Sequence, residues 1–213
     1  KIIIIDNSDL SYTGHDINGK NLRGTESSLI LLSQQFSKMG IYVDYANCID
    51  VKKKVNGVNY FNKNKINKSI IYDLAIVISD ANQFNLVSSV KKAVFSNSNQ
   101  PIEKFIRKKQ LIPFLKFKPI VITLCDYQFG KRSFFTSFYG KKTIPITVDP
   151  KFLDVDINAN YLPEKKVVYN IRSNRNLDLL IKIWIEKIYP VNNEFKLYIT
   201  PDLIEYTDKL KQH

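Results

Sequence analysis

The stretch Ile2-Ile3-Ile4-Ile5-Asp6 is an unbroken apolar run that ends in a carboxylate. Four consecutive β-branched residues favour a strand, and the lack of polar alternation is typical of a parallel strand buried on both faces. A polar stretch over 7–24 follows, and it predicts a long loop of the kind that often carries function. Next come a predicted helix over 25–39, closed by Gly40, and a predicted strand over 41–46. The apolar positions of that helix are Leu29, Leu32, Phe36 and Met39.

The alternation of strands and helices continues along the chain. Buried strands are predicted at 73–78 and 120–124, and a helix opened by a proline is predicted over 101–115 between them. The stretch 151–165 is predicted to be a linker, and after it the pattern resumes with a strand at 166–169. These patterns predict an α/β protein with a mainly parallel sheet flanked by helices.

The net charge of the chain is strongly positive. The 213 residues carry 32 Lys and Arg against 20 Asp and Glu, a formal net charge of +12, and only five of the basic residues are Arg. Because base readout favours arginine, a lysine excess spread along the chain indicates nonspecific attraction to polyanions, and we expect no specific nucleic-acid partner. A compositional bias, an anionic membrane surface and a phosphate-bearing substrate remain as alternatives.

The sequence contains two short basic stretches. One lies at 104–109 within the predicted helix, and the other, at 129–142, is interleaved with aromatic residues. The stretch at 129–142 could be a patch for a membrane surface or for single-stranded nucleic acid, or a buried helix with a basic edge. The cluster at 104–109 could meet a lipid headgroup or an anionic acceptor. The two cysteines, Cys48 and Cys125, have no metal-type spacing and indicate a reducing compartment. We therefore expect a cytoplasmic location, with peripheral contact at the inner membrane face as a further option.

Three motifs, taken in order, resemble a known family. Residues 22–26, Leu-Arg-Gly-Thr-Glu, open a helix that ends in the step Lys-Met-Gly-Ile-Tyr-Val at 38–43. The segments 92–110 and 167–180 follow it. In this order they resemble the group 1 nucleotide-sugar glycosyltransferases of GT-B architecture, and the resemblance spans most of the chain.

The resemblance implies an architecture and an activity. The N-terminal Rossmann-like domain would span 1–150 on the acceptor side, and 166–213 would begin a donor-side Rossmann-like domain that is truncated here. The activity would be transfer of a hexose from a nucleotide sugar to a saccharide or lipid-linked acceptor in polysaccharide biosynthesis. The nucleotide sugar would be a substrate, and neither a cofactor nor a metal ion is implied.

The resemblance and local chemistry together indicate phosphate-binding residues. A glycine directly before a helix allows close approach of backbone, and the helix N-terminus offers free N–H groups to an anion. We expect Thr25 to be the N-cap of that helix. Arginines at the start of the second domain would hold the donor diphosphate. The residues assigned in this way are Arg23, Gly24, Thr25, Glu26, Arg172 and Arg175.

The sequence leaves the general base open. Asn97 stands where many members of the family carry a histidine, and an amide can orient a hydroxyl but cannot take its proton near neutral pH. Asp126 follows a predicted strand and is either a base or a helix cap. His15 lies in the first loop and is a further candidate. Two other functions stay open: a noncatalytic truncated binding module of the same fold, and a basic protein that binds nucleic acid or a membrane surface.

Overall fold

The structure is a computed structural model that describes residues 1–18, 22, 24–96, 102–127, 139–145, 164–169 and 176–199. The chain divides into two compact units, Lys1–Asp154 and Val155–His213, and each is described by itself. The predicted site residues Arg23, Asn97, Arg172 and Arg175 lie outside the described residues, as does most of the predicted linker.

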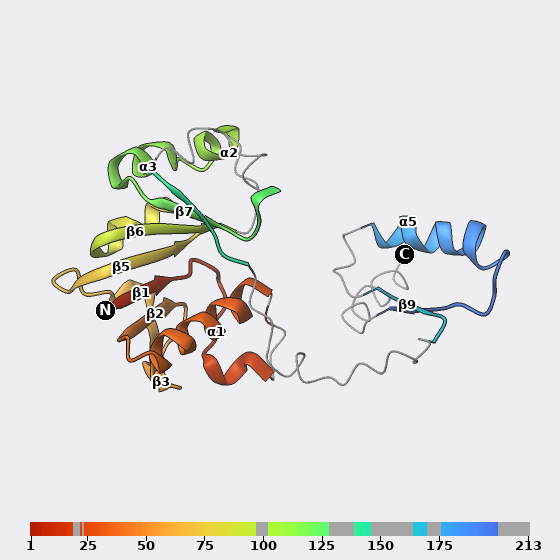
Figure 1. The fold of residues 1–213 in the computed structure, drawn as a ribbon, viewed down its shortest axis with the longest axis horizontal. Helices are drawn as coiled ribbons and strands as arrows, with labels where there is room; N and C mark the ends of the chain where they lie inside the picture. Colours follow the sequence, from red (N-terminus) through yellow and green to blue (C-terminus); the bar gives the residue numbers. More distant parts are fainter. Residues whose placement is uncertain are drawn as a thin grey trace. The chain divides into compact units, whose positions relative to one another are not determined.

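The first unit is built on an eight-stranded sheet in the order β3-β4-β2-β1-β5-β6-β7-β8 (Figure 1). Its pairings are parallel except for the antiparallel pair β3–β4, so the predicted α/β class is confirmed. The strands are β1 Ile2–Ile5, β2 Val43–Asn47, β3 Lys53–Val55, β4 Val58–Asn62, β5 Ile71–Ile78, β6 Ser88–Ser96, β7 Ile120–Thr123 and β8 Lys141–Thr143. The helices are α1 Gly24–Lys38, α2 Ile102–Arg107 and α3 Leu111–Phe117, with 3-10 turns η1 Gly14–Asn18, η2 Lys63–Lys65 and η3 Ala81–Leu86.

The strand β1 divides the core into two layers. Because side chains alternate across a strand, Ile2 and Ile4 pack with α1 on one face of the sheet. Ile3 and Ile5 face the opposite layer, in which Phe84 of η3 and the aromatic residues of α2 and α3 are buried. Helices therefore cover both faces (Figure 1), which explains why this strand is apolar at every position.

Helix α1 differs slightly from its sequence prediction. It begins at Gly24, so Thr25 lies inside the first turn and is not the N-cap. At the other end Gly40 has a φ of +80°, and its N–H and that of Ile41 donate to the carbonyls of Ser37 and Phe36 at 3.0 Å each. This pattern is a Schellman motif, as the glycine predicted. Met39, predicted to be on the apolar face, is 66% exposed because it lies at this turn.

The helix predicted over 101–115 is two helices, α2 and α3. Lys109 between them has a φ of +52°, and the N–H of Gln110 donates to the carbonyl of Phe105 at 2.9 Å. The physical reason for the break is Pro113, which has no N–H to donate in the middle of a continuous helix. In the observed structure Pro113 occupies the first turn of α3, where no intrahelical donor is needed.

The second unit has a parallel pair of strands, β9 Lys166–Tyr169 and β10 Lys196–Ile199. Between them lie helix α5 Leu177–Ile183 and a π-helical turn, Trp184–Ile188. Tyr169 and Leu177 are buried together, with Leu180 and Ile181 packed against them. The described part of this unit is therefore a single strand–helix–strand layer.

Three glycines give a graded test of the fold. Gly57 has a φ of +79° in the two-residue turn between β3 and β4, and a Cβ there would lie 2.0 Å from Ser37 Oγ. Gly40 has a positive φ, but a Cβ there would meet no atom within 4 Å. Gly24 has no positive φ, and a Cβ there would also meet no atom within 4 Å. We expect Gly40→Ala to lower the free energy of unfolding by about 1 kcal/mol and Gly57→Ala by more, with Gly24→Ala as the unaffected control. Urea unfolding followed by circular dichroism measures this order, and equal losses at all three positions would contradict it.

Candidate functional site

The strand order reverses at β1, which creates a crevice. From β1 the chain continues to β2, β3 and β4 on one side of β1. It then returns to β5 on the other side and continues outward to β8. The strands β1 and β5 are parallel neighbours, and Ile5 is paired with Val77, so both end at the same edge of the sheet. In open α/β sheets the connections diverge at such a reversal, and ligands bind between them beyond the carboxyl ends of the strands.

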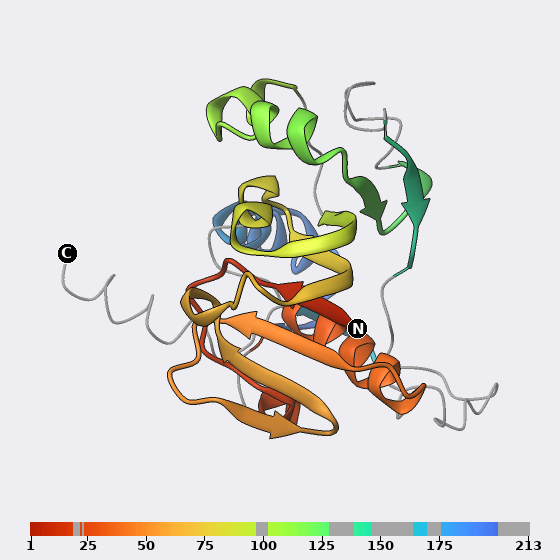
Figure 2. The same ribbon diagram turned by 90° about the vertical axis from the view of Figure 1, so that its left-hand side faces the viewer.

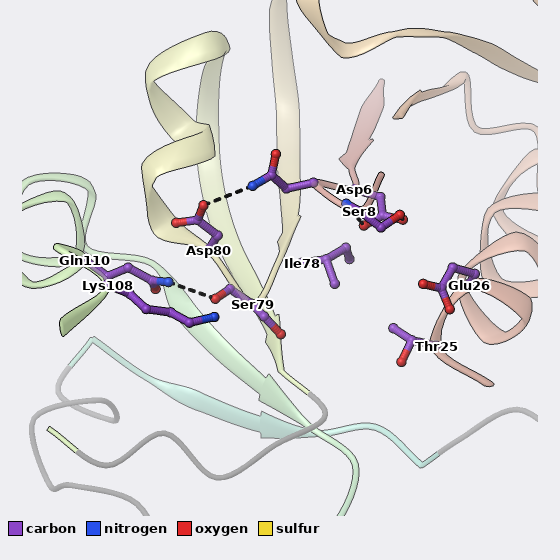
Figure 3. A pocket seen from close by; sticks show the side chains of 10 residues that line it. Asp6, Ser8, Thr25, Glu26, Ile78, Ser79, Asp80, Lys108 and Gln110 are labelled. Carbon is purple, nitrogen blue, oxygen red and sulfur yellow. Dashed lines mark hydrogen bonds between the residues drawn. The ribbon is translucent and has the colours of Figure 1, made fainter. Parts of the chain in front are cut away.

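A pocket of about 580 Å³ lies at this place (Figure 3). Residues from the ends of β1 and β5, the first turn of α1 and the connection from α2 to α3 line it. They are Asp6, Asn7, Ser8, Thr25, Glu26, Ile78, Ser79, Asp80, Lys108 and Gln110. Its size falls in the usual range for small-ligand sites, but its lining is far more polar than is common.

The carboxylate of Asp6 is buried at the pocket wall and accepts three hydrogen bonds. Its residue is 4% exposed, and one oxygen accepts a hydrogen bond from the Ser8 N–H at 2.9 Å. The other oxygen accepts from the Ser8 hydroxyl at 2.7 Å and from the Tyr12 hydroxyl at 2.6 Å. Three donors thus compensate the burial of the charge and leave acceptor capacity on the carboxylate for a ligand.

A column of buried tyrosines supports Asp6 from the core. The hydroxyls of Tyr12 and Tyr45 are 2.7 Å apart, and the rings of Tyr45 and Tyr60 lie 5.2 Å apart. Burial raises the pKa of Tyr12, and the neighbouring Tyr45 and Asp6 raise it further. Burial likewise raises the pKa of Tyr45 and raises that of Tyr60 to about 12. The tyrosines therefore stay protonated, and Tyr12 remains a donor to Asp6.

The opposite wall is held by Gln110. Ser79 follows β5 with a φ of +55°, a backbone conformation that is costly for a residue with a side chain. The Gln110 amide, 4% exposed, donates to the Ser79 carbonyl at 3.1 Å and accepts from the Ala81 N–H at 3.4 Å. Asp80 caps η3 by accepting from the Asn82 N–H at 3.0 Å. These bonds fix the turn that presents Ser79 and Asp80 to the pocket (Figure 3).

The lining is rich in hydrogen-bond acceptors. Asp6, Glu26 and Asp80 contribute carboxylates, and Lys108 supplies the only cation among the described lining residues. Glu26 is 4% exposed and lies in the first turn of α1. Within the described residues, no three His, Cys, Asp or Glu side chains are grouped so that they could hold a metal ion. The arrangement suits a ligand that donates several hydrogen bonds.

The structure brings some of the predicted site residues together. Thr25 and Glu26 line the pocket, whereas Gly24 is exposed at the helix start with nothing within 4 Å of an added Cβ. His15 lies exposed in η1, and neither it nor Asp126 is among the described lining residues. Asp126 is exposed after β7 and accepts a hydrogen bond from the Thr143 hydroxyl at 2.7 Å.

Sequence reasoning missed the residues that follow β1 and β5. Asp6 comes directly after β1, and Asp80 comes two residues after β5. The apolar runs of the sequence predict both strands. The rule that ligands gather at the carboxyl ends of parallel strands, which makes Asp126 a candidate, also selects these two. Lys108 was part of a predicted basic cluster, but no sequence pattern linked it to β1.

Comparison with known proteins adds no assignment. No protein-family model, no curated protein and no solved structure matches the chain. Among the described residues, no helix combines the length and the apolar character needed to cross a bilayer. The function is therefore argued from the pocket itself.

The Asp6–Tyr12 contact can be tested by Tyr12→Phe. The change removes one donor from a buried carboxylate and one partner from Tyr45, so we expect the free energy of unfolding of the first unit to fall by about 1–3 kcal/mol. Hydrogen exchange of the β1 and β2 amides measures it, since these strands flank the contact. The matched control is Tyr127→Phe, at a residue of the same unit that is 70% exposed, for which we expect less than about 0.5 kcal/mol. Equal exchange in the two variants would contradict the role given to Tyr12.

The tyrosine column also predicts a pH dependence. Tyrosines of the unfolded chain titrate near pH 10, whereas the native state holds the Tyr60 proton up to about pH 12. A raised native pKa means that stability is complete below pH 10 and falls as the pH rises through 12. We expect part of the tyrosinate absorbance at 295 nm to appear only together with the loss of circular dichroism. Full tyrosine ionisation near pH 10 in a folded protein would contradict it.

Proposed function

We propose that the chain is the acceptor-side part of a nucleotide-sugar-dependent hexosyltransferase, and that the pocket binds the hydroxyl groups of a saccharide acceptor. The observation that carries this proposal is the polar, carboxylate-rich pocket between the ends of β1 and β5. The motifs that resemble the group 1 glycosyltransferases supply the reaction class. The finer description of the sheet as Rossmann-like belongs to the same proposal and is supported by its strand reversal at β1.

The lining favours a saccharide over a phosphate in the interior of the pocket. A phosphate placed between Asp6, Glu26 and Asp80 would be repelled by like charge. Sugar hydroxyls instead donate to carboxylates and accept from hydroxyl groups such as those of Ser8 and Thr25. A phosphate group is better placed near Lys108, which supplies the only cation among the described lining residues.

The proposed reaction assigns this chain a positioning role. An acceptor hydroxyl attacks the anomeric carbon of the donor, the bond from that carbon to the nucleoside diphosphate breaks, and the hydroxyl proton passes to a phosphate oxygen of the departing nucleoside diphosphate. Asp6 and Asp80 are held by hydrogen bonds from their neighbours, so they can fix the acceptor without reorganising. Glu26 is the carboxylate on the rigid helix α1 that faces the same space, and it is proposed to contact the reacting hydroxyl (Figure 3).

Saccharide binding by the full chain tests the proposal. Ligand-observed NMR titration with a panel of monosaccharides, disaccharides and nucleotide sugars is expected to show binding of at least one hexose-containing compound. Glu26→Gln replaces an acceptor by a mixed donor and acceptor in the pocket, so we expect about a tenfold or larger loss of affinity. Glu103→Gln, at an exposed residue of α2, is the matched control and should bind as the unmodified chain does.

The titration, combined with an assay of hexose transfer, distinguishes an enzyme from a binding module. Binding together with hexose transfer supports the enzyme, and binding without transfer supports a noncatalytic binding module of the same fold. No binding of any compound in the panel, or binding that Glu26→Gln leaves unchanged, would overturn the proposed site.

A further inference from the structure

Helices α2 and α3 and the turn between them present an unusual outer surface, named here the α2–α3 surface. It consists of the exposed side chains of residues 106–118. The inward side of the pair is aromatic, because Phe105 and Phe114 are buried with ring centroids 5.3 Å apart. On the outward side Ile106, Ile112 and Leu115 are 60%, 77% and 44% exposed. The apolar side chains of this segment thus lie on both sides, although only one side has a core to cover.

The exposed apolar residues of α3 are grouped on one face. Ile112, Leu115 and Lys116 are spaced three and four residues apart, which places them together on a helix surface. Phe114, between them in sequence, points to the core. Figures 1 and 2 show α2 and α3 beyond the β6–β7 part of the sheet. Ile106 of α2 adds a further exposed aliphatic side chain to this segment.

The same segment is rich in exposed cations. Residues 102–118 contain six basic residues against one carboxylate, that of Glu103. The basic residues with exposed side chains are Arg107, Lys108, Lys109, Lys116 and Lys118. The Lys116 ammonium lies 5.0 Å from the centre of the Phe117 ring. The surface therefore combines a strong local positive charge with unpaired apolar area.

We propose that the α2–α3 surface docks on an anionic lipid bilayer. Lysine and arginine are attracted to the phosphates of anionic lipids, and isoleucine and leucine gain by entering the boundary between headgroups and acyl chains. A single-stranded nucleic acid would use the same cations but needs aromatic faces for base stacking, and the exposed side chains among these cations are aliphatic. The combination therefore favours a bilayer over a nucleic acid.

Docking here would bring the membrane next to the pocket. Lys108 and Gln110 belong to the turn between α2 and α3, and both line the pocket (Figure 3). If the proposed hexose transfer holds, the acceptor would be a lipid-linked saccharide whose phosphate lies near Lys108 while its sugar enters the pocket. This last step rests on the proposed function, whereas the docking itself does not.

Vesicle sedimentation with the full chain tests the docking. The probes are large vesicles of phosphatidylcholine alone and of phosphatidylcholine with phosphatidylglycerol. We expect binding to the anionic vesicles only, weakened by high salt, and about a tenfold or larger loss in Ile112→Ser/Leu115→Ser. The matched control is Ile71→Ser/Val90→Ser, at aliphatic residues of β5 and β6 that are 69% and 71% exposed, and it should bind as the unmodified chain does. Circular dichroism confirms that both double variants are folded.

Three results would overturn the proposal. They are no binding to anionic vesicles, equal loss in the two double variants, and binding to labelled single-stranded RNA that is tighter than vesicle binding and unaffected by Ile112→Ser/Leu115→Ser. Saccharide titration of the same variants separates the two proposals, because Ile112 and Leu115 do not line the pocket. Loss of vesicle binding with intact saccharide binding supports docking without depending on the reaction.

Discussion

The pairing of β1 with a parallel neighbour on each side is the constraint on which the rest of the first unit depends. Ile2 to Ile5 can be apolar throughout because strands flank them and helices cover both faces. Since the chain leaves β1 toward β2 and returns at β5, the connections beyond these two strands diverge. The pocket is the space between them, so its location follows from the topology, while its chemistry follows from the residues just past each strand.

Burying the polar groups of the pocket costs free energy, and hydrogen bonds from neighbouring residues offset that cost. A carboxylate as deeply placed as Asp6 is tolerated because three donors meet it, and one of them, Tyr12, is itself held by Tyr45. On the other wall, the amide of Gln110 supports the unfavourable backbone of Ser79. Rigid, oriented acceptors are what a site needs to select a hydroxyl-rich ligand without paying for rearrangement on binding.

Sequence reasoning predicted the elements with strong local signals. The buried runs of β1, β5 and β7 and the glycine that ends α1 were identified because burial and a positive φ leave a clear pattern. The break between α2 and α3 was missed although Pro113 signals it, and the start of α1 differed by one residue, as helix ends commonly do. The pocket was found only in part, at Thr25 and Glu26, because the contact between Gln110 and Ser79 is set by tertiary packing that no local pattern records.

The central claim is that the reversal of strand order at β1 builds a saccharide site. Mapping of backbone amide shifts on the isotopically labelled chain during saccharide addition tests it most directly. The account requires the largest shifts at Ser8, Glu26 and Ser79, which come from three different elements and meet only in this pocket. Shifts confined to another part of the chain, with these three amides unmoved at saturating saccharide, would contradict it.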